Sequence, residues 1–179
     1  MGLRLVQLAL TVVFGLASTP GLASEKPYAG WQEREIKALS QSDVDDLLAG
    51  RGWGFAKPAE LNGYPGPAHV LDLKRELALS PEQVAAVDKV FQAMRRRAIA
   101  LGRDYVEAER DLEAVFAGGT ATSDSMARHT LAAERLRAAL RQVHLEAHLL
   151  TRPLLTAHQL THYQRLRGYA GSAGHKHAH

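Results

Sequence analysis

The chain has no cysteine among its 179 residues, and aromatic side chains make up only 6% of it. The absence of cysteine excludes disulfides, thiolate metal sites and thiol catalysis. The shortage of aromatic and β-branched residues argues against a sheet protein, because those residues favour strands. Ala, Leu, Arg and Glu dominate instead. We therefore expect an all-α protein, of a length that suits one domain.

The sequence also lacks a hydrophobic run long enough to span a membrane. Its main apolar stretch, residues 5–17, is well short of the ~20 residues that a spanning helix needs. Arg4 precedes this stretch and Gly21-Leu22-Ala23 follows it, which is the order of a secretory signal peptide. We expect residues 1–23 to be a signal peptide cleaved near Ala23, and the mature protein to be periplasmic. A membrane anchor is the less favoured alternative.

Strong charge of one sign is missing as well. The formal net charge is +3, and it falls by one when Arg4 is removed with the signal. A balance this weak does not indicate nucleic acid as a partner. The sequence shows neither a nucleophile-plus-base constellation nor an outstanding carboxylate pair, so we do not expect an enzyme.

Two long stretches place apolar residues at alternating steps of three and four, the pattern of amphipathic helices with a coiled-coil-like seam. They cover about residues 81–116 and 123–151 and are separated by a break rich in Gly and Thr. A connection this short predicts antiparallel packing. We expect an elongated antiparallel helical hairpin with shorter flanking helices. The expected organisation is a signal peptide (1–23), N-terminal short helices and turns (24–67), a helical hairpin domain (68–170) and a His-rich flexible tail (171–179).

Shorter helices are predicted on both sides of the long stretches. Ser40 followed by Asp43 indicates a capped helix that ends at Gly50. Gly102 lies inside the first long helix but off its seam, where it costs about 1 kcal/mol relative to Ala and suggests a bend. The other predicted helices are Tyr28–Leu39, His69–Leu77 and Ala157–Tyr169.

A short motif of the form Leu-Ser/Thr-x-x-Gln occurs twice. In each copy the hydroxyl residue is the expected N-cap, Gln reaches back to the amide of the cap, and Leu packs onto the first turn. The copies consist of Leu79, Ser80 and Gln83, and of Leu155, Thr156 and Gln159.

Two such copies in an exported, cysteine-free helical chain resemble the Spy/CpxP family of periplasmic proteins, whose hallmark is a repeated Leu-Thr-x-x-Gln at helix starts. The resemblance covers about residues 79–168, with Ser80 in place of Thr in the first copy. It implies ATP-independent binding of unfolded or misfolded proteins by a curved helical homodimer with a basic, partly apolar concave face. It implies no catalysis and no required cofactor, and a membrane-bound regulatory protein as a further partner. The same group includes heavy-metal resistance proteins and metal sensors.

The long helices are rich in arginine. An arginine can lay its apolar stem along a partner while its guanidinium meets a carboxylate, which suits client binding. The alternative is a solvated helix surface balanced by neighbouring acidic residues. The candidate client-binding residues are Arg95, Arg96, Arg103, Arg137 and Arg141.

Histidine is concentrated near the C-terminus. His144 and His148 are spaced to share a helix face and are candidate ligands for Zn, Cu, Ni or Co. The alternative is that both are half-buried residues beside the seam. The zinc protease motif is excluded, because Glu146 does not directly follow the first His. A second such pair is His158 and His162, and the terminal His175, His177 and His179 would bind Zn, Cu or Ni weakly, whether native or a cloning tag.

Overall fold

The computed structural model describes residues 26–169, which contain helices and no strand. The predicted all-α class is therefore confirmed. The signal peptide expected at residues 1–23 and the His-rich tail expected at 171–179 lie outside the described residues.

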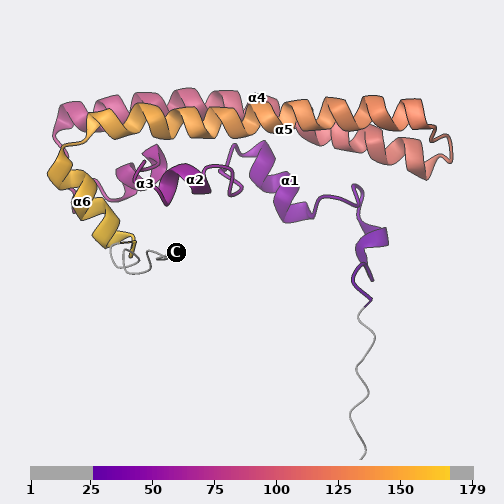
Figure 1. Cartoon of the computed structure of the whole chain (residues 1–179), viewed down its shortest axis with the longest axis horizontal. Coiled ribbons are helices and arrows are strands. Elements are labelled where there is room, and N and C mark those ends of the chain that lie inside the picture. The colour runs from indigo at the N-terminus through magenta and orange to yellow at the C-terminus, as the bar shows by residue number, and fades with distance from the viewer. Residues whose placement is uncertain (1–25, 170–179) are drawn as a thin grey trace, which may run out of the picture.

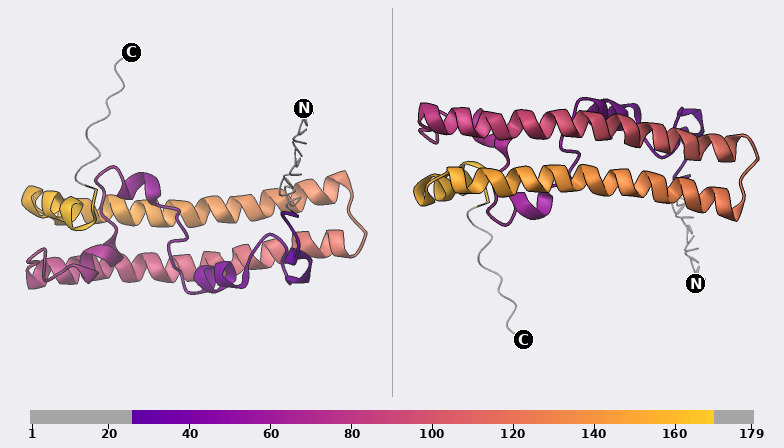
Figure 2. Two further views of the ribbon diagram at one scale, coloured as in Figure 1. Left: turned by 90° about the horizontal axis from the view of Figure 1, so that it is seen from below. Right: turned by 90° about the horizontal axis from the view of Figure 1, so that it is seen from above.

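The fold is built on two long helices that lie side by side along their length (Figures 1 and 2). These are α4, Pro81–Ala117, and α5, Ser123–Thr151. Residues 118–122 join them, so the two helices run in opposite directions. Their facing residues alternate at steps of three and four and are buried, among them Ala98 and Tyr105 on α4 and Leu140 and Val143 on α5.

Shorter elements all lie on one side of this helix pair (Figure 1). They are α1 (Gln41–Leu48), α2 (Lys57–Glu60), α3 (Pro67–Asp72) and α6 (Ala157–Leu166), with 3₁₀ turns at Trp31–Glu33 (η1) and Arg152–Leu154 (η2). The opposite side of the pair faces no other element of residues 26–169. Side chains of α1, the segment before it and the loop at Phe55 share one buried cluster with α4 and α5. The segment from Ile36 to Phe55 is thus packed onto the long helices.

The predicted helix at Tyr28–Leu39 is wrong, because only the single turn η1 forms there. Beyond it the backbone is extended at Arg34, and Ile36 and Leu39 insert into the cluster under α4. The backbone N–H of Lys37 donates to the Glu113 carboxylate of α4 at 3.1 Å. Contacts with the long helix replace the hydrogen bonds that a local helix would have made. The helices predicted at His69–Leu77 and Ala157–Tyr169 both form, but they end earlier than predicted, at Asp72 and Leu166.

Gly102 has a packing role that its place off the seam did not suggest. It is buried where the end of α1 crosses α4, and a Cβ built there would lie 2.9 Å from the carbonyl carbon of Leu47 and closer still to its oxygen. Glycine is therefore needed for the close approach of two backbones.

The two Leu-Ser/Thr-x-x-Gln motifs cap α4 and α6, and they also meet in space. Ser80 and Thr156 are the N-caps, with both hydrogen bonds of each capping box present. The amides of Gln83 and Gln159 then bond each other reciprocally, at 2.9 and 3.0 Å. Each amide nitrogen also donates to a backbone carbonyl near the other motif, Leu154 for Gln83 and Leu77 for Gln159. The repeated glutamine thus ties the start of α4 to the start of α6.

Candidate functional site

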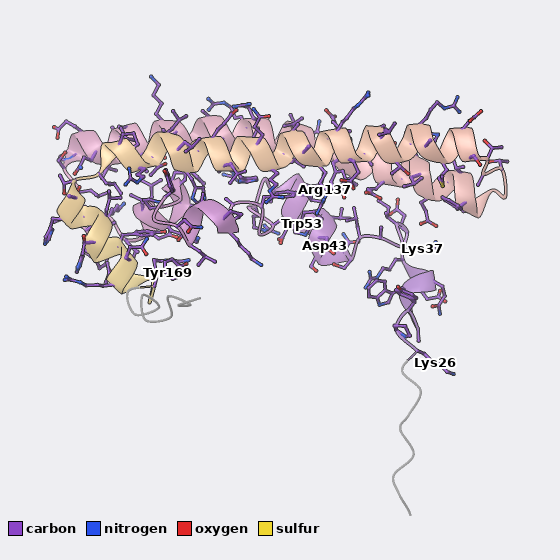
Figure 3. All side chains as sticks on the ribbon, viewed as in Figure 1. Lys26, Lys37, Asp43, Trp53, Arg137 and Tyr169 are labelled. Atoms are coloured by element: carbon purple, nitrogen blue, oxygen red, sulfur yellow. The ribbon has the colours of Figure 1, made fainter. Side chains whose placement is uncertain are left out.

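The five candidate client-binding arginines lie in three separate places. Arg95 lines a cavity beneath α4. Arg96 and Arg103 are exposed and seven residues apart, so they share one side of α4. Arg137 and Arg141 line a hollow on α5 beside the loop at Trp53. Figure 3 shows Arg137 and Trp53 on the same side of the helix pair. The structure therefore does not bring the five together on one surface.

A different basic and apolar surface runs along α5, on the side of the helix turned away from α4. Its residues follow strict heptad spacing, and six of the seven are exposed. Leu131 and Leu149 are 56% and 58% exposed. Sequence reasoning missed this stripe because the inner seam accounted for most of the apolar periodicity of α5. We call it the outer stripe; it consists of Arg128, Leu131, Arg135, Ala138, Gln142, Leu145 and Leu149.

His144 and His148 lie one turn apart on α5 and line the same cavity, of about 510 Å³. A third histidine, His69 of α3, lines it too, with Phe91 and Met94 of α4. We call this space the histidine cavity. The sequence predicted the first pair, but His69 is far away in the chain and reaches the cavity only because α3 packs against the helix pair.

His144 is almost fully buried, with 3% of its surface exposed, and its Nε2 atom has no hydrogen-bond partner among the described residues. Burial, together with the neighbouring His148, lowers the pKa of His144 to about 4. The ring is therefore neutral at pH 7. It stacks on Phe55, with ring centroids 6.0 Å apart.

His148 is held in one orientation by the loop between α2 and α3. Its Nδ1 atom lies 2.7 Å from the carbonyl oxygen of Tyr64, which can only accept a hydrogen bond, so Nδ1 carries the proton. In a neutral ring of this tautomer the lone pair is on Nε2. The same ring approaches the Glu60 carboxylate, at 3.7 Å from Nδ1.

Glu60 is a buried carboxylate that joins this loop to the C-terminal helix. It accepts hydrogen bonds from the backbone N–H of Gly66 and from the hydroxyls of Tyr163 and Tyr169, and it pairs with Arg167. Burial and the bond to Glu60 raise the pKa of Tyr163 above its ordinary value. These bonds satisfy the carboxylate and direct its oxygens to structural partners.

The chemistry available at the histidine cavity depends on how many ligands converge there. Among residues 26–169, no group of three or more His, Asp or Glu side chains is placed to hold a metal ion. Glu146 is paired with Arg97 at 2.9 Å. The other predicted pair, His158 and His162, lies on α6 with its rings stacked 6.2 Å apart. A metal at His144 and His148 would thus have two protein ligands from the described chain.

Searches with the chain found no matching family model, curated protein or solved structure. The resemblance to the Spy/CpxP family therefore rests on the two capping motifs. Within residues 26–169 no helix is both long enough and apolar enough to cross a membrane.

Proposed function

We propose that the chain is a periplasmic Spy/CpxP-like stress protein that binds unfolded or misfolded polypeptides without ATP. The observation on which this rests is the outer stripe of α5. Two arginines and three leucines share this side of the helix, and all of them except the half-exposed Leu145 are exposed. We further propose that, like the family it resembles, the protein acts as a homodimer and communicates with a membrane-bound regulatory protein.

The outer stripe has the two chemical properties that a promiscuous polypeptide-binding surface needs. Leu131, Leu145 and Leu149 offer apolar area to the side chains that an unfolded chain exposes. Arg128 and Arg135 form no ion pair with any residue between 26 and 169. Their guanidinium groups are therefore free to bind carboxylates of the client while their stems extend the apolar area.

An aggregation assay tests this proposal. The mature protein, at stoichiometric excess and without ATP, should suppress light scattering from a reduced, unfolding client such as α-lactalbumin. Leu131→Gln with Leu149→Gln should abolish most of the suppression. The matched control is Leu61→Gln with Leu166→Gln, which removes two exposed leucines from other elements and should leave suppression intact.

The arginine contribution is tested in the same assay. Arg128→Gln with Arg135→Gln should weaken suppression, and added salt should weaken it in the parent protein, because screening reduces exposed ionic contacts. Arg96→Gln with Arg103→Gln makes the same charge change on α4 and should have a smaller effect. Equal aggregation with and without the parent protein would overturn the proposed function. If both leucine double variants lose suppression equally, the outer stripe is not the surface that binds the client.

The second candidate function is periplasmic metal binding in a sensor or resistance protein, through His144 and His148. It is favoured by one observation: the two rings share a cavity, one with a nitrogen that has no partner within residues 26–169 and the other fixed through Nδ1 by a backbone carbonyl. Such an outer hydrogen bond is how ligating histidines are commonly oriented. Two imidazoles alone predict modest affinity for Zn, Cu, Ni or Co.

Calorimetric titration of protein that ends before Gly171 tests the metal proposal without the terminal histidines. We expect modest Zn or Cu binding that falls as the pH drops, because ligation requires neutral imidazoles. His144→Ala with His148→Ala should remove it, and His158→Ala with His162→Ala should not. Loss of all binding on truncation would assign the metal to the tail alone.

A further inference from the structure

A hollow of about 440 Å³ lies between α5 and the loop that leads into α2. Three of its lining side chains are cationic, and they come from two different parts of the fold. Lys57 starts α2, whereas Arg137 and Arg141 are four residues apart on α5. No acidic side chain of residues 26–169 lines it. We call it the basic hollow; its remaining lining residues are Trp53, Gly54, Phe55 and Pro58.

The positive charge of the basic hollow is hardly neutralised within residues 26–169. Lys57 and Arg141 form no ion pair there. Among the described acidic residues Arg137 pairs only with Glu134, one turn earlier on the same helix, at 3.4 Å. Both partners are about half exposed, and such a pair contributes little. Cations that converge from separate elements with only one weak, exposed ion pair among them favour an added anion.

Trp53 forms a rigid aromatic wall of the basic hollow. Its backbone adopts φ of 41°, in the left-handed region that a non-glycine residue rarely occupies. Its indole N–H donates to Asp43 at 2.7 Å, and its ring packs edge-on against Phe55, with centroids 5.2 Å apart. Local strain held by surrounding contacts is a feature of ligand sites.

The carboxylate of Asp43, which is bonded to Trp53, is turned to other partners. Its carboxylate accepts the indole N–H of Trp53 and the backbone N–H of Ser40, and it is bonded to the Ser40 hydroxyl as well. Together these hydrogen bonds hold the pKa of Asp43 below its ordinary value. Asp43 thus positions the tryptophan and does not line the basic hollow. Figure 3 shows Asp43, Trp53 and Arg137 close together on this side of the helix pair.

We propose that the basic hollow binds a small organic molecule that carries a carboxylate or phosphate oxyanion. Arg141 and Lys57 bind the oxyanion from opposite walls, assisted by Arg137, and the carbon skeleton of the ligand packs against Trp53. A guanidinium matches both oxyanions in a two-pronged hydrogen-bonding geometry. The volume lies within the usual range for small-molecule sites, about 300–1,000 Å³. Binding of this ligand in the basic hollow is separate from polypeptide binding on the outer stripe and does not depend on it.

Fluorescence reports on this site directly, because the chain has only two tryptophans. In a Trp31→Phe variant of the full chain, Trp53 is the remaining emitter. Inorganic phosphate, pyrophosphate, citrate and chloride are titrated at constant ionic strength. We expect a saturable change in Trp53 emission with the multivalent oxyanions and none with chloride. Saturation by phosphate and pyrophosphate alone would identify a phosphate ligand, and saturation by citrate alone a carboxylate ligand.

Matched variants distinguish binding in the basic hollow from non-specific attraction of anions to the positive charge of the protein surface. In the Trp31→Phe background, Lys57→Gln with Arg141→Gln should weaken binding at least tenfold. Arg96→Gln with Arg103→Gln removes the same charge from α4 and should leave affinity within twofold. Arg141→Lys keeps the charge but loses the two-pronged hydrogen-bonding geometry of the guanidinium, and it should weaken binding by an intermediate factor. A linear response to every oxyanion, or equal weakening by both double variants, would overturn the proposal. Circular dichroism of each variant checks that a loss does not reflect unfolding.

Discussion

Gly102→Ala should destabilise the protein, although the same change in an exposed helix would stabilise it. Replacing an interior helix glycine by alanine normally gains about 1 kcal/mol. Here the new methyl group would lie 2.9 Å from the Leu47 carbonyl carbon and closer to the oxygen, against 3.4–4 Å for ordinary contact. Both clashing atoms belong to backbone, so no side chain can rotate away. The end of α1 must therefore move off α4.

The cost of that movement follows from what α1 buries. Leu47 is 0% exposed and belongs to the cluster that joins α1, α4 and α5. Overpacking of this kind costs about 1–3 kcal/mol, and partial exposure of a buried leucine adds up to roughly 2 kcal/mol. After subtraction of the helix-propensity gain, we expect a net loss of about 2 kcal/mol in the free energy of unfolding.

Urea denaturation followed by far-UV circular dichroism measures this loss. Ala100→Gly is the matched control, because it exchanges the same two residue types at an exposed position of the same helix; it should cost about 1 kcal/mol. Both variants should thus be less stable than the parent, although one replaces glycine by alanine and the other replaces alanine by glycine. If Gly102→Ala raises the free energy of unfolding, the proposed close contact between α1 and α4 is refuted.

Three further predictions concern caps and buried titratable groups. Ser80→Ala and Thr156→Ala should each lower the free energy of unfolding by about 1 kcal/mol; unchanged urea midpoints would contradict the capping role. The His144 ring has a pKa of about 4 in the folded protein and about 6.5 in the unfolded chain, so the unfolded chain takes up the proton first. The free energy of unfolding therefore keeps its full value above pH 6.5 and is about 3 kcal/mol lower at pH 4 because of this group. His144→Leu should lack this part of the decline when unfolding curves are measured between pH 7.5 and 4. Tyr163→Phe removes a hydroxyl that donates to buried Glu60 and should cost about 2 kcal/mol; a melting temperature equal to that of the parent would show that the bond contributes nothing.

Features that depend on neighbouring residues were determined by the sequence alone. Composition predicted the all-α class, and apolar periodicity placed α4 and α5 to within a residue of their observed bounds. The N-caps at Ser40, Ser80 and Thr156 were also predictable. A capping box needs only residues three apart, and a helix seam needs only residues three and four apart.

Features that need two distant segments were decided by the tertiary structure. The segment before Ser40 would be helical by its own pattern, yet it is mostly non-helical, and Ile36 and Leu39 are instead buried in the cluster that they share with α4. The pairing of Gln83 with Gln159 joins residues 76 positions apart. His69 reaches the histidine cavity, and Lys57 the basic hollow, only because the N-terminal residues fold back along the long helices. Local hydrogen bonds and periodicity specify each helix, but which helix faces meet depends on the shape and burial of the complete fold, and no short stretch of sequence contains that information.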